Sequence, residues 1–384
     1  MERNIKLLAL FNFFTDLKFH SAILILYFVA VTKSYTLGMS IFSITMLSKA
    51  LFEVPTGVFS DMIGRKKTVV LGAISASFSA IFYALGGTYL PLVIGAIFEG
   101  LSRSWYSGNN DALLHDTLQA SLKKEQFSHY FGRLSSMFQI ALAIGAVVGS
   151  FIANESFAIV MWLSVIPQIF CVILALFIKE PPMLTKESSN IFSHIKNSFR
   201  YLWKNKLLRY LSVLDILSFG IGEASFQFRA AFVATLWPIW AIGISKMLSF
   251  IGAYFSYWFS GKFIKKFGES AILIIANIYY RSIDFLALLF PTVLSPILIS
   301  STSLMFGAAD VSINSLMHHE FTDRERATLS SLNSLFGSIF YGGFTIILGI
   351  LADWTGPTTA LIIANTVALP RIYLAWKIKQ IENR

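Results

Sequence analysis

Long apolar runs dominate the sequence, and short polar segments separate them. A bilayer core about 30 Å thick needs roughly 20 apolar residues per helix, and about twelve runs approach that length. They cover residues 5–31, 38–60, 67–88, 91–117, 132–153, 156–178, 207–232, 240–263, 270–290, 294–317, 328–352 and 357–377. The pattern predicts an all-α membrane protein with about twelve transmembrane helices.

The predicted spans form two sets of six, separated by the only long hydrophilic segment. We therefore expect an N-terminal six-helix bundle in residues 1–178, a cytoplasmic linker in 179–206 and a C-terminal six-helix bundle in 207–384. Within the linker Ile191, Ile195 and Phe199 recur at helical spacing, beside Lys196 and Arg200. This pattern predicts an amphipathic helix on the inner membrane surface. We interpret this helix as a simple linker rather than as a regulatory element.

Composition agrees with a membrane protein, because 55% of the residues are hydrophobic and only 14% are charged, against about a quarter in soluble domains. The net charge of +10 raises the possibility of nucleic-acid binding. However, the basic residues fall in alternate short loops, in the central segment and near the C-terminus, as the positive-inside rule requires. We expect a multi-pass protein of the cell inner (plasma) membrane with both termini in the cytoplasm, and no nucleic-acid partner.

A short motif occurs at the same place in each half of the chain. The segment Gly57–Lys67 follows the second predicted span, and Gly261–Gly268 follows the eighth. Both fit the pattern G-x-x-x-[charged]-x-x-G. Repeated halves are common in secondary transporters, which place the substrate site near the middle of the membrane.

The first copy of the motif resembles the signature loop of the major facilitator superfamily, and its surroundings resemble the drug-efflux-like bacterial branch. The resemblance implies two pseudo-symmetric six-helix bundles, a cavity lined by helices 1, 4, 7 and 10, and a cytoplasmic gate at this loop. The gate residues would be Gly57, Asp61, Gly64, Arg65 and Lys66. Glycines allow close helix approach or a sharp turn, and Asp61 could pair with Arg65 or face a helix N-terminus. Solvated loop charges are the simpler alternative.

Charged residues inside the predicted spans concentrate in spans 1, 4, 7 and 10. Because each such charge is costly in a membrane, we take them as candidates for a pathway of protons or substrate. The candidates are Asp16, His20, Glu99, Arg103, Asp111, Glu223 and Asp310.

Several candidates also fit purely structural roles. Glu99 and Arg103 are spaced i,i+4 and can neutralise each other. Asp16 and His20 share the same spacing, which predicts one helix face and either a proton relay or a buried ion pair; Lys18 would point elsewhere. On the ninth span, residues 281 and 284 are predicted to form a structural ion pair.

Glu223 is the leading candidate for a proton carrier. It lies deep in the seventh span, after Gly220 and Gly222, and no cation lies one turn away in the sequence. A carboxylate removed from water holds a proton more readily. Asp111 and Asp310 occupy matching places in the two halves and could instead hold an inner gate.

These features predict a secondary active transporter that works by alternating access, with proton-coupled efflux of an amphipathic or cationic small molecule. The alternative is proton-coupled uptake of a nutrient, because the Gly145–Gly149 motif lacks the proline that drug antiporters of this family usually carry. As a bare GxxxG motif it predicts close helix packing. A polytopic membrane enzyme is disfavoured, since no catalytic motif occurs and the segment 318–320 lacks metal-site spacing. We expect no cofactor and no metal, and a monomer that contacts the lipid bilayer, a small-molecule substrate and protons.

Overall fold

The computed structural model describes residues 2–107, 109–120, 127–181, 202, 204–320 and 326–382, and in these residues the regular structure is entirely helical. The first half of the chain contributes α1 (Glu2–Asp16), α2 (Leu24–Thr32), α3 (Tyr35–Ile63), α4 (Arg65–Leu85), α5 (Tyr89–Tyr106), α6 (Asn109–Ala120), α7 (Phe127–Ala153) and α8 (Phe157–Phe177). The second half contributes α10 (Lys206–Val233), α11 (Ile239–Phe267), α12 (Glu269–Leu289), α13 (Ser295–Ser301), the 3-10 turn η2 (Thr302–Met305), α14 (Phe306–Glu320), α15 (Arg326–Thr355), α16 (Pro357–Val367) and α17 (Pro370–Glu382).

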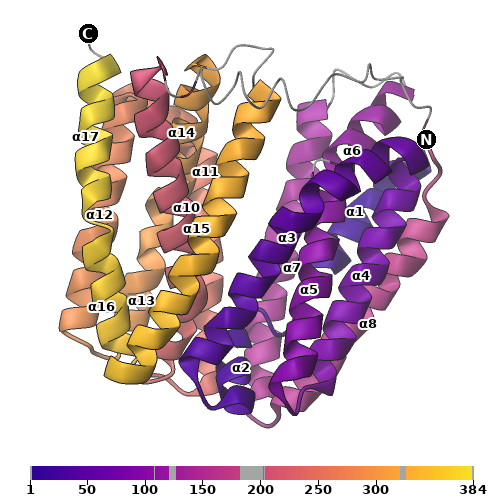
Figure 1. The fold of residues 1–384 in the computed structure, drawn as a ribbon, viewed down its shortest axis with the longest axis horizontal. Coiled ribbons are helices and arrows are strands. Elements are labelled where there is room, and N and C mark those ends of the chain that lie inside the picture. Colours follow the sequence, from indigo (N-terminus) through magenta and orange to yellow (C-terminus); the bar gives the residue numbers. More distant parts are fainter. Residues whose placement is uncertain are drawn as a thin grey trace. The chain divides into compact units, whose positions relative to one another are not determined.

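These helices form two compact units (Figure 1). The first unit contains α1 to α8 together with the start of α11, Trp237–Met247. The second unit contains α10, the rest of α11 from Leu248, and the helices that follow. The predicted amphipathic helix of the linker lies outside the described residues.

Within the described residues, eight helical segments are long and apolar enough to cross a membrane. They are Tyr35–Ser60, Arg65–Leu85, Phe157–Phe177, Ile239–Phe267, Glu269–Leu289, Ser295–Glu320, Leu329–Thr355 and Pro357–Glu382. A shorter apolar segment, Met137–Ala153, lies within the predicted fifth span. The first, fourth and seventh predicted spans are absent from both groups, and they are three of the four in which intramembrane charges concentrate.

Three of the predicted spans are interrupted rather than continuous. The first divides into α1 and α2 around a non-helical segment at residues 17–23, the fourth divides between α5 and α6, and the twelfth divides between α16 and α17 at residues 368–369. The tenth span also changes its winding, from α13 through η2 to α14. Hydropathy averages over a window and cannot detect such local breaks within a predicted span.

The ends of several helices follow from local sequence. Ser34, Ser156 and Asn205 act as N-caps, each accepting a hydrogen bond from the backbone N–H three residues later, which satisfies a donor that the helix itself leaves free. Gly64 and Gly268 end the matching helices α3 and α11 with φ of 94° and 82°. This conformation is strained for residues with a side chain, so the turn explains the last glycine of both motif copies.

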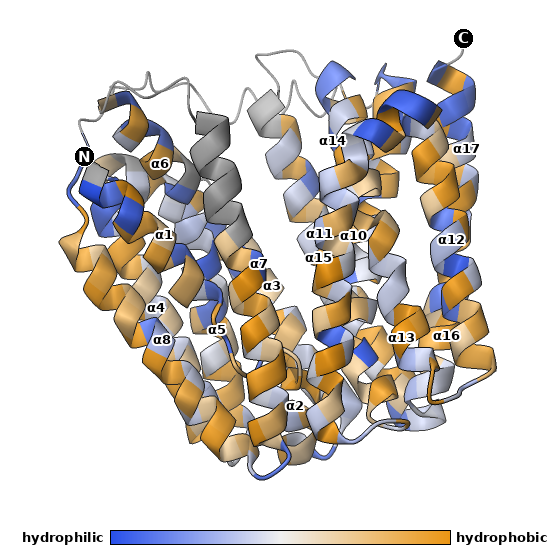
Figure 2. Ribbon diagram, turned by 180° about the vertical axis from the view of Figure 1, so that it is seen from behind, coloured by the Kyte–Doolittle hydropathy of each residue, from blue (hydrophilic) through white to orange (hydrophobic). Residues whose placement is uncertain are grey.

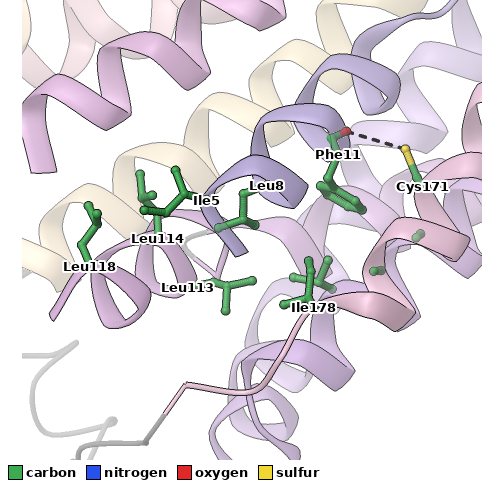
Figure 3. Close-up of a cluster of buried hydrophobic side chains, with 11 residues drawn as sticks. Ile5, Leu8, Phe11, Leu113, Leu114, Leu118, Cys171 and Ile178 are labelled. Atoms are coloured by element: carbon green, nitrogen blue, oxygen red, sulfur yellow. Dashed lines mark hydrogen bonds between the residues drawn. The ribbon is translucent and has the colours of Figure 1, made fainter. Parts of the chain in front are cut away.

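Each unit has an apolar core near one end. In the first unit it joins α1, α4, α6 and α8, with Phe11 and Cys171 completely buried (Figure 3). In the second unit it joins α10, α12, α14 and α17, with Leu329 of α15. These helices correspond to spans 1, 3, 4 and 6 of one half and 7, 9, 10 and 12 of the other. The two cores therefore repeat the internal symmetry of the sequence.

Within each unit, hydrophilic residues gather at one end of the helices (Figure 2). In the first unit this end carries the N-terminus and α6, and in the second it carries the end of α17 (Figures 1 and 2). The placement of these ends in the cytoplasm stays a prediction from the loop charges.

Candidate functional site

The break in the first span lies against residues of α7 and α8. On α7, a Cβ atom at Gly149 would lie 1.6 Å from the carbonyl oxygen of Phe19, and one at Gly145 would lie 2.9 Å from that of Lys18. Both positions therefore need glycine, because the backbone of the break lies directly against α7. The predicted close packing of the GxxxG motif is present, but its partner is a non-helical segment.

Polar groups of α8 satisfy the backbone around this break. The amide of Gln168 donates to the carbonyls of Phe14 (3.4 Å) and Thr15 (3.3 Å), which end α1. The backbone N–H of His20 donates to the Ser164 hydroxyl at 3.2 Å. Unpaired backbone groups are costly inside a membrane, so these contacts allow the chain to leave the helix at this depth.

A charge cluster of the first unit lies beside the break. Lys18 Nζ contacts Glu99 Oε1 at 2.8 Å, and Arg103 Nε contacts the same oxygen at 3.2 Å. The Glu99 side chain is only 12% exposed, whereas Arg103 is 47% exposed. The predicted pair within α5 is confirmed, but the expectation that Lys18 points elsewhere was wrong, because the break turns it towards α5.

Asp16 and His20 do not share a helix face. Since α1 ends at Asp16, the i,i+4 spacing has no helix to act through, and no hydrogen bond joins the two side chains. Asp16 is within electrostatic range of Lys18, Glu99 and Arg103. His20 is buried, its ring packs edge-on against Tyr83, and Nδ1 has no hydrogen-bond partner among the described residues.

The predicted gate loop forms a tight network within the first unit. After the turn at Gly64, the carboxylate of Glu180 accepts hydrogen bonds from the backbone N–H groups of Arg65 (2.7 Å) and Lys66 (2.9 Å). Glu180 thus caps the N-terminus of α4, where the helix dipole favours an anion. The side chain of Asp61 lies outside the described residues, and a Cβ at Gly57 would meet no described atom within 4 Å. Within the first unit, close helix approach therefore does not explain Gly57.

Arg65 extends the network to the fourth span. Its guanidinium lies 3.7 Å from Asp116 and within reach of Ser60 and Asn109. The Asn109 amide in turn donates to the Arg65 carbonyl at 3.2 Å. The network joins α3, α4 and α6 at their hydrophilic end. Asp111 lies one turn into α6, with a side chain outside the described residues.

In the second unit, two candidate carboxylates have only neutral hydrogen-bond donors. Glu223 of α10 is partly buried and accepts from the Gln227 amide at 2.6 Å. Asp310 of α14 accepts from the Tyr257 hydroxyl at 2.9 Å and from the Asn314 amide at 3.3 Å. Among the described residues neither forms an ion pair. Asp215 of α10 lies within electrostatic range of Asp310.

The glycines before Glu223 have different surroundings. A Cβ at Gly220 would lie 2.2 Å from the Phe340 ring of α15, whereas one at Gly222 would meet nothing within 4 Å. Close approach therefore explains Gly220 alone, and α10 continues unbroken through both positions.

Sequence reasoning missed the contacts that join distant segments. Glu180 and Asn109 had no local signal, since an acid after the end of a helix and an asparagine at the start of one are common. The pair between residues 281 and 284 of α12 is confirmed at 3.6 Å, but Arg229 of α10 lies closer to Asp284, at 2.9 Å. In the described part of the chain, no group of three or more His, Cys, Asp or Glu residues is placed to hold a metal ion.

Comparison with known proteins decides the family. The sequence profile of the Major Facilitator Superfamily matches residues 7–341. The chain belongs to the major facilitator superfamily. Its all-helical fold is that of the superfamily, and it is a membrane transporter rather than an enzyme.

Relatives in the superfamily include drug-resistance proteins. Multidrug resistance protein 1 of Bacillus subtilis is 23% identical over 85% of this chain and 85% of its own length. Quinolone resistance protein NorA of Staphylococcus aureus is 23% identical over 61% of this chain and 59% of its own length. An uncharacterised transporter of Buchnera aphidicola is 23% identical over 80% of this chain and 79% of its own length.

Solved structures of superfamily transporters share the fold. A mutant of the nucleoside transporter NupG matches with a TM-score of 0.84 at 14% identity, covering 98% of this chain and 99% of that one. The POT family transporter PepTSo matches with a TM-score of 0.80 at 9% identity, covering 99% and 98%. At these identities the likeness concerns the fold alone.

Proposed function

We propose that this superfamily member exports an amphipathic or cationic small molecule in exchange for protons, with Glu223 as the proton carrier. The observation that carries the proposal is the pairing of Glu223 with a neutral amide, Gln227, at 2.6 Å. A carboxylate that is held by a neutral donor can gain or lose a proton without breaking an ion pair.

The other carboxylates of the spans support this choice by contrast. Glu99 contacts two cations and Asp284 also contacts two. Protonating either would leave cations unpaired in a medium of low polarity, which costs several kcal/mol. Glu223 and Asp310 carry no such penalty, and Asp310 therefore serves as a second protonation site in the proposal.

A carboxylate that alternates between neutral and charged forms suits exchange with a cation. The charged form attracts the cationic ligand, and the protonated form releases it, so proton and ligand compete for one site. The drug-resistance relatives from Bacillus subtilis and Staphylococcus aureus support export and an amphipathic ligand.

The proposal is tested in everted membrane vesicles with ethidium as the fluorescent probe. Antiport predicts that an acidic lumen drives ethidium into the vesicles and that nigericin with potassium abolishes the uptake. In Glu223→Gln vesicles, uptake driven by the pH gradient should fall to the level without a gradient. Glu155→Gln removes an exposed carboxylate between α7 and α8 and serves as the matched control.

Three results would oppose the proposal at different points. Gradient-driven uptake that is unchanged in Glu223→Gln would remove this residue as the proton carrier. Uptake that does not depend on the gradient would exclude proton coupling. Ethidium leaving the lumen with protons would reverse the direction and favour a symporter.

A further inference from the structure

The second unit contains a cluster of arginines that the proposed transport cycle does not use. Arg229 of α10, Arg281 of α12 and Arg371 of α17 lie in predicted membrane spans, and Arg281 and Arg371 are only 9% and 6% exposed. Asp284 is the carboxylate that contacts the cluster, and each of its two oxygens already contacts one guanidinium. Among the described residues, these three positive charges thus share one contacting carboxylate.

Both terminal nitrogens of the Arg229 guanidinium already contact protein groups. One of its nitrogens contacts Asp284 Oδ1 at 2.9 Å, and the other donates to the Thr302 hydroxyl at 3.0 Å. It also reaches the carbonyl of Ile299 at 3.4 Å. Arg229 therefore contacts the segment in which α13 changes to the 3-10 turn η2.

The other two arginines are incompletely satisfied. Arg281 lies 3.6 Å from Asp284, and its Nε has no hydrogen-bond partner in the described residues. The Nε of Arg371 likewise has no partner there, although Arg371 is within electrostatic range of Arg281 and Asp284. Arginine does not give up its proton in proteins, so deprotonation cannot remove these charges.

A small void lies against the cluster. The space open to the centre of a water-sized particle is ≈ 10 Å³, and Ser225, Arg229, Arg281, Asp284 and Asn365 provide the polar lining. Two of these lining residues carry a buried polar atom without a hydrogen-bond partner among the described residues, Nε in Arg281 and Oδ1 in Asn365. A void of this size holds about one water-sized particle. Sulfate and phosphate are too large for it.

We propose that the second unit binds one small inorganic monoanion, such as chloride, in this void between Arg229 and Arg281. Arg371 contributes a further positive charge from α17, which packs against α12. A water molecule could donate and accept hydrogen bonds here, but it would leave two positive charges without compensation. An uncompensated charge is strongly unfavourable in a membrane-buried site, whereas a halide lowers the excess charge and accepts the free N–H groups.

The test uses the full-length purified protein in detergent, with sodium gluconate, chloride or bromide at equal ionic strength. Thermal unfolding is followed by intrinsic tryptophan fluorescence. Chloride and bromide should raise Tm saturably by several degrees over gluconate, because a ligand that binds only the folded state stabilises it. Arg281→Gln should lose the halide dependence, and Lys262→Gln, an exposed cation of α11, should retain it.

A second variant separates anion binding from a purely structural ion-pair network. Asp284→Asn removes the internal anion that competes with the halide, so the apparent Kd for chloride should fall by about tenfold, and chloride should rescue the stability of the variant. In crystals of the wild-type protein that contain bromide, an anomalous peak should appear beside the Arg281 guanidinium. This measurement does not require that Arg281→Gln folds. Equal Tm in all three salts, or an empty anomalous map at this position, would overturn the proposal and leave water as the occupant.

Discussion

Replacement of Gly149 by alanine tests whether α7 supports the break in the first span. The new Cβ would lie 1.6 Å from the Phe19 carbonyl oxygen and 2.5 Å from its carbon. Non-bonded atoms of this kind need about 3.4 Å or more, so the backbone of the break must move by roughly 2 Å. The movement would disturb the nearby contacts of Lys18 with Glu99 and of the His20 N–H with α8.

The size of the effect follows from these contacts. Overpacking in a close-packed interior costs about 1–3 kcal/mol, and the lost polar contacts add about 1 kcal/mol. The higher helix propensity of alanine relative to glycine offsets up to about 1 kcal/mol of this destabilisation. We therefore expect Gly149→Ala to destabilise the first unit by about 1–4 kcal/mol, which corresponds to a Tm lower by at least about 2 °C for a domain of this size.

The lone cysteine provides the assay. Cys171 of α8 is completely buried and its thiol contacts Thr15 and Phe11 of α1, so it becomes accessible only when the first unit opens. A fluorogenic maleimide during a heating ramp measures that event. Gly57→Ala is the matched control, because its Cβ meets nothing within 4 Å and its Tm should stay unchanged or rise slightly. If Gly149→Ala and Gly57→Ala melt within one degree of each other, the inferred packing against the break is incorrect.

Three further substitutions in the wild-type background extend this reasoning. Gly64→Ala and Gly268→Ala both strain a positive φ, at a cost of about 1–3 kcal/mol, but only Gly64→Ala also brings its Cβ within 3.0 Å of a carboxylate oxygen. Gly64→Ala should therefore have the lower Tm, and the reverse order would contradict the assigned crowding. Lys18→Gln should destabilise by about 2 kcal/mol, less than a fully broken buried pair because Glu99 keeps a second cation. Chemical denaturation measures this change against Lys33→Gln, an exposed control, and equal midpoints would show that the Lys18 contact adds no stability.

Much of the fold could be predicted because its signals are local and repeated. The apolar runs indicated where helices lie, and the last glycine of each motif copy indicated a turn, which Gly64 and Gly268 form with nearly equal φ values. The family followed from the same loop. These features depend on residues that are close in sequence.

The contacts of the candidate site depend on segments that are far apart in sequence. Helical spacing placed Asp16 with His20, but the chain leaves the helix between them, and Lys18 instead meets Glu99, 81 positions later. Arg371 had no signal at all, because a single cation near a proline in the last span is not unusual. Only packing of α17 against α12 brings it to the other arginines.

The dependence of the first span on α7 and α8 has a consequence for biogenesis. The ribosome makes the segment at residues 17–23 first, while Gly149, Ser164 and Gln168 are made more than 100 residues later. Until they arrive, the carbonyls of Phe14 and Thr15 and the N–H of His20 lack the partners that they have in the finished protein. The first span therefore reaches its final form late, after the last two helices of its own half enter the bilayer. A nascent chain that stops before α7 should hold this segment in a different conformation or outside the membrane core.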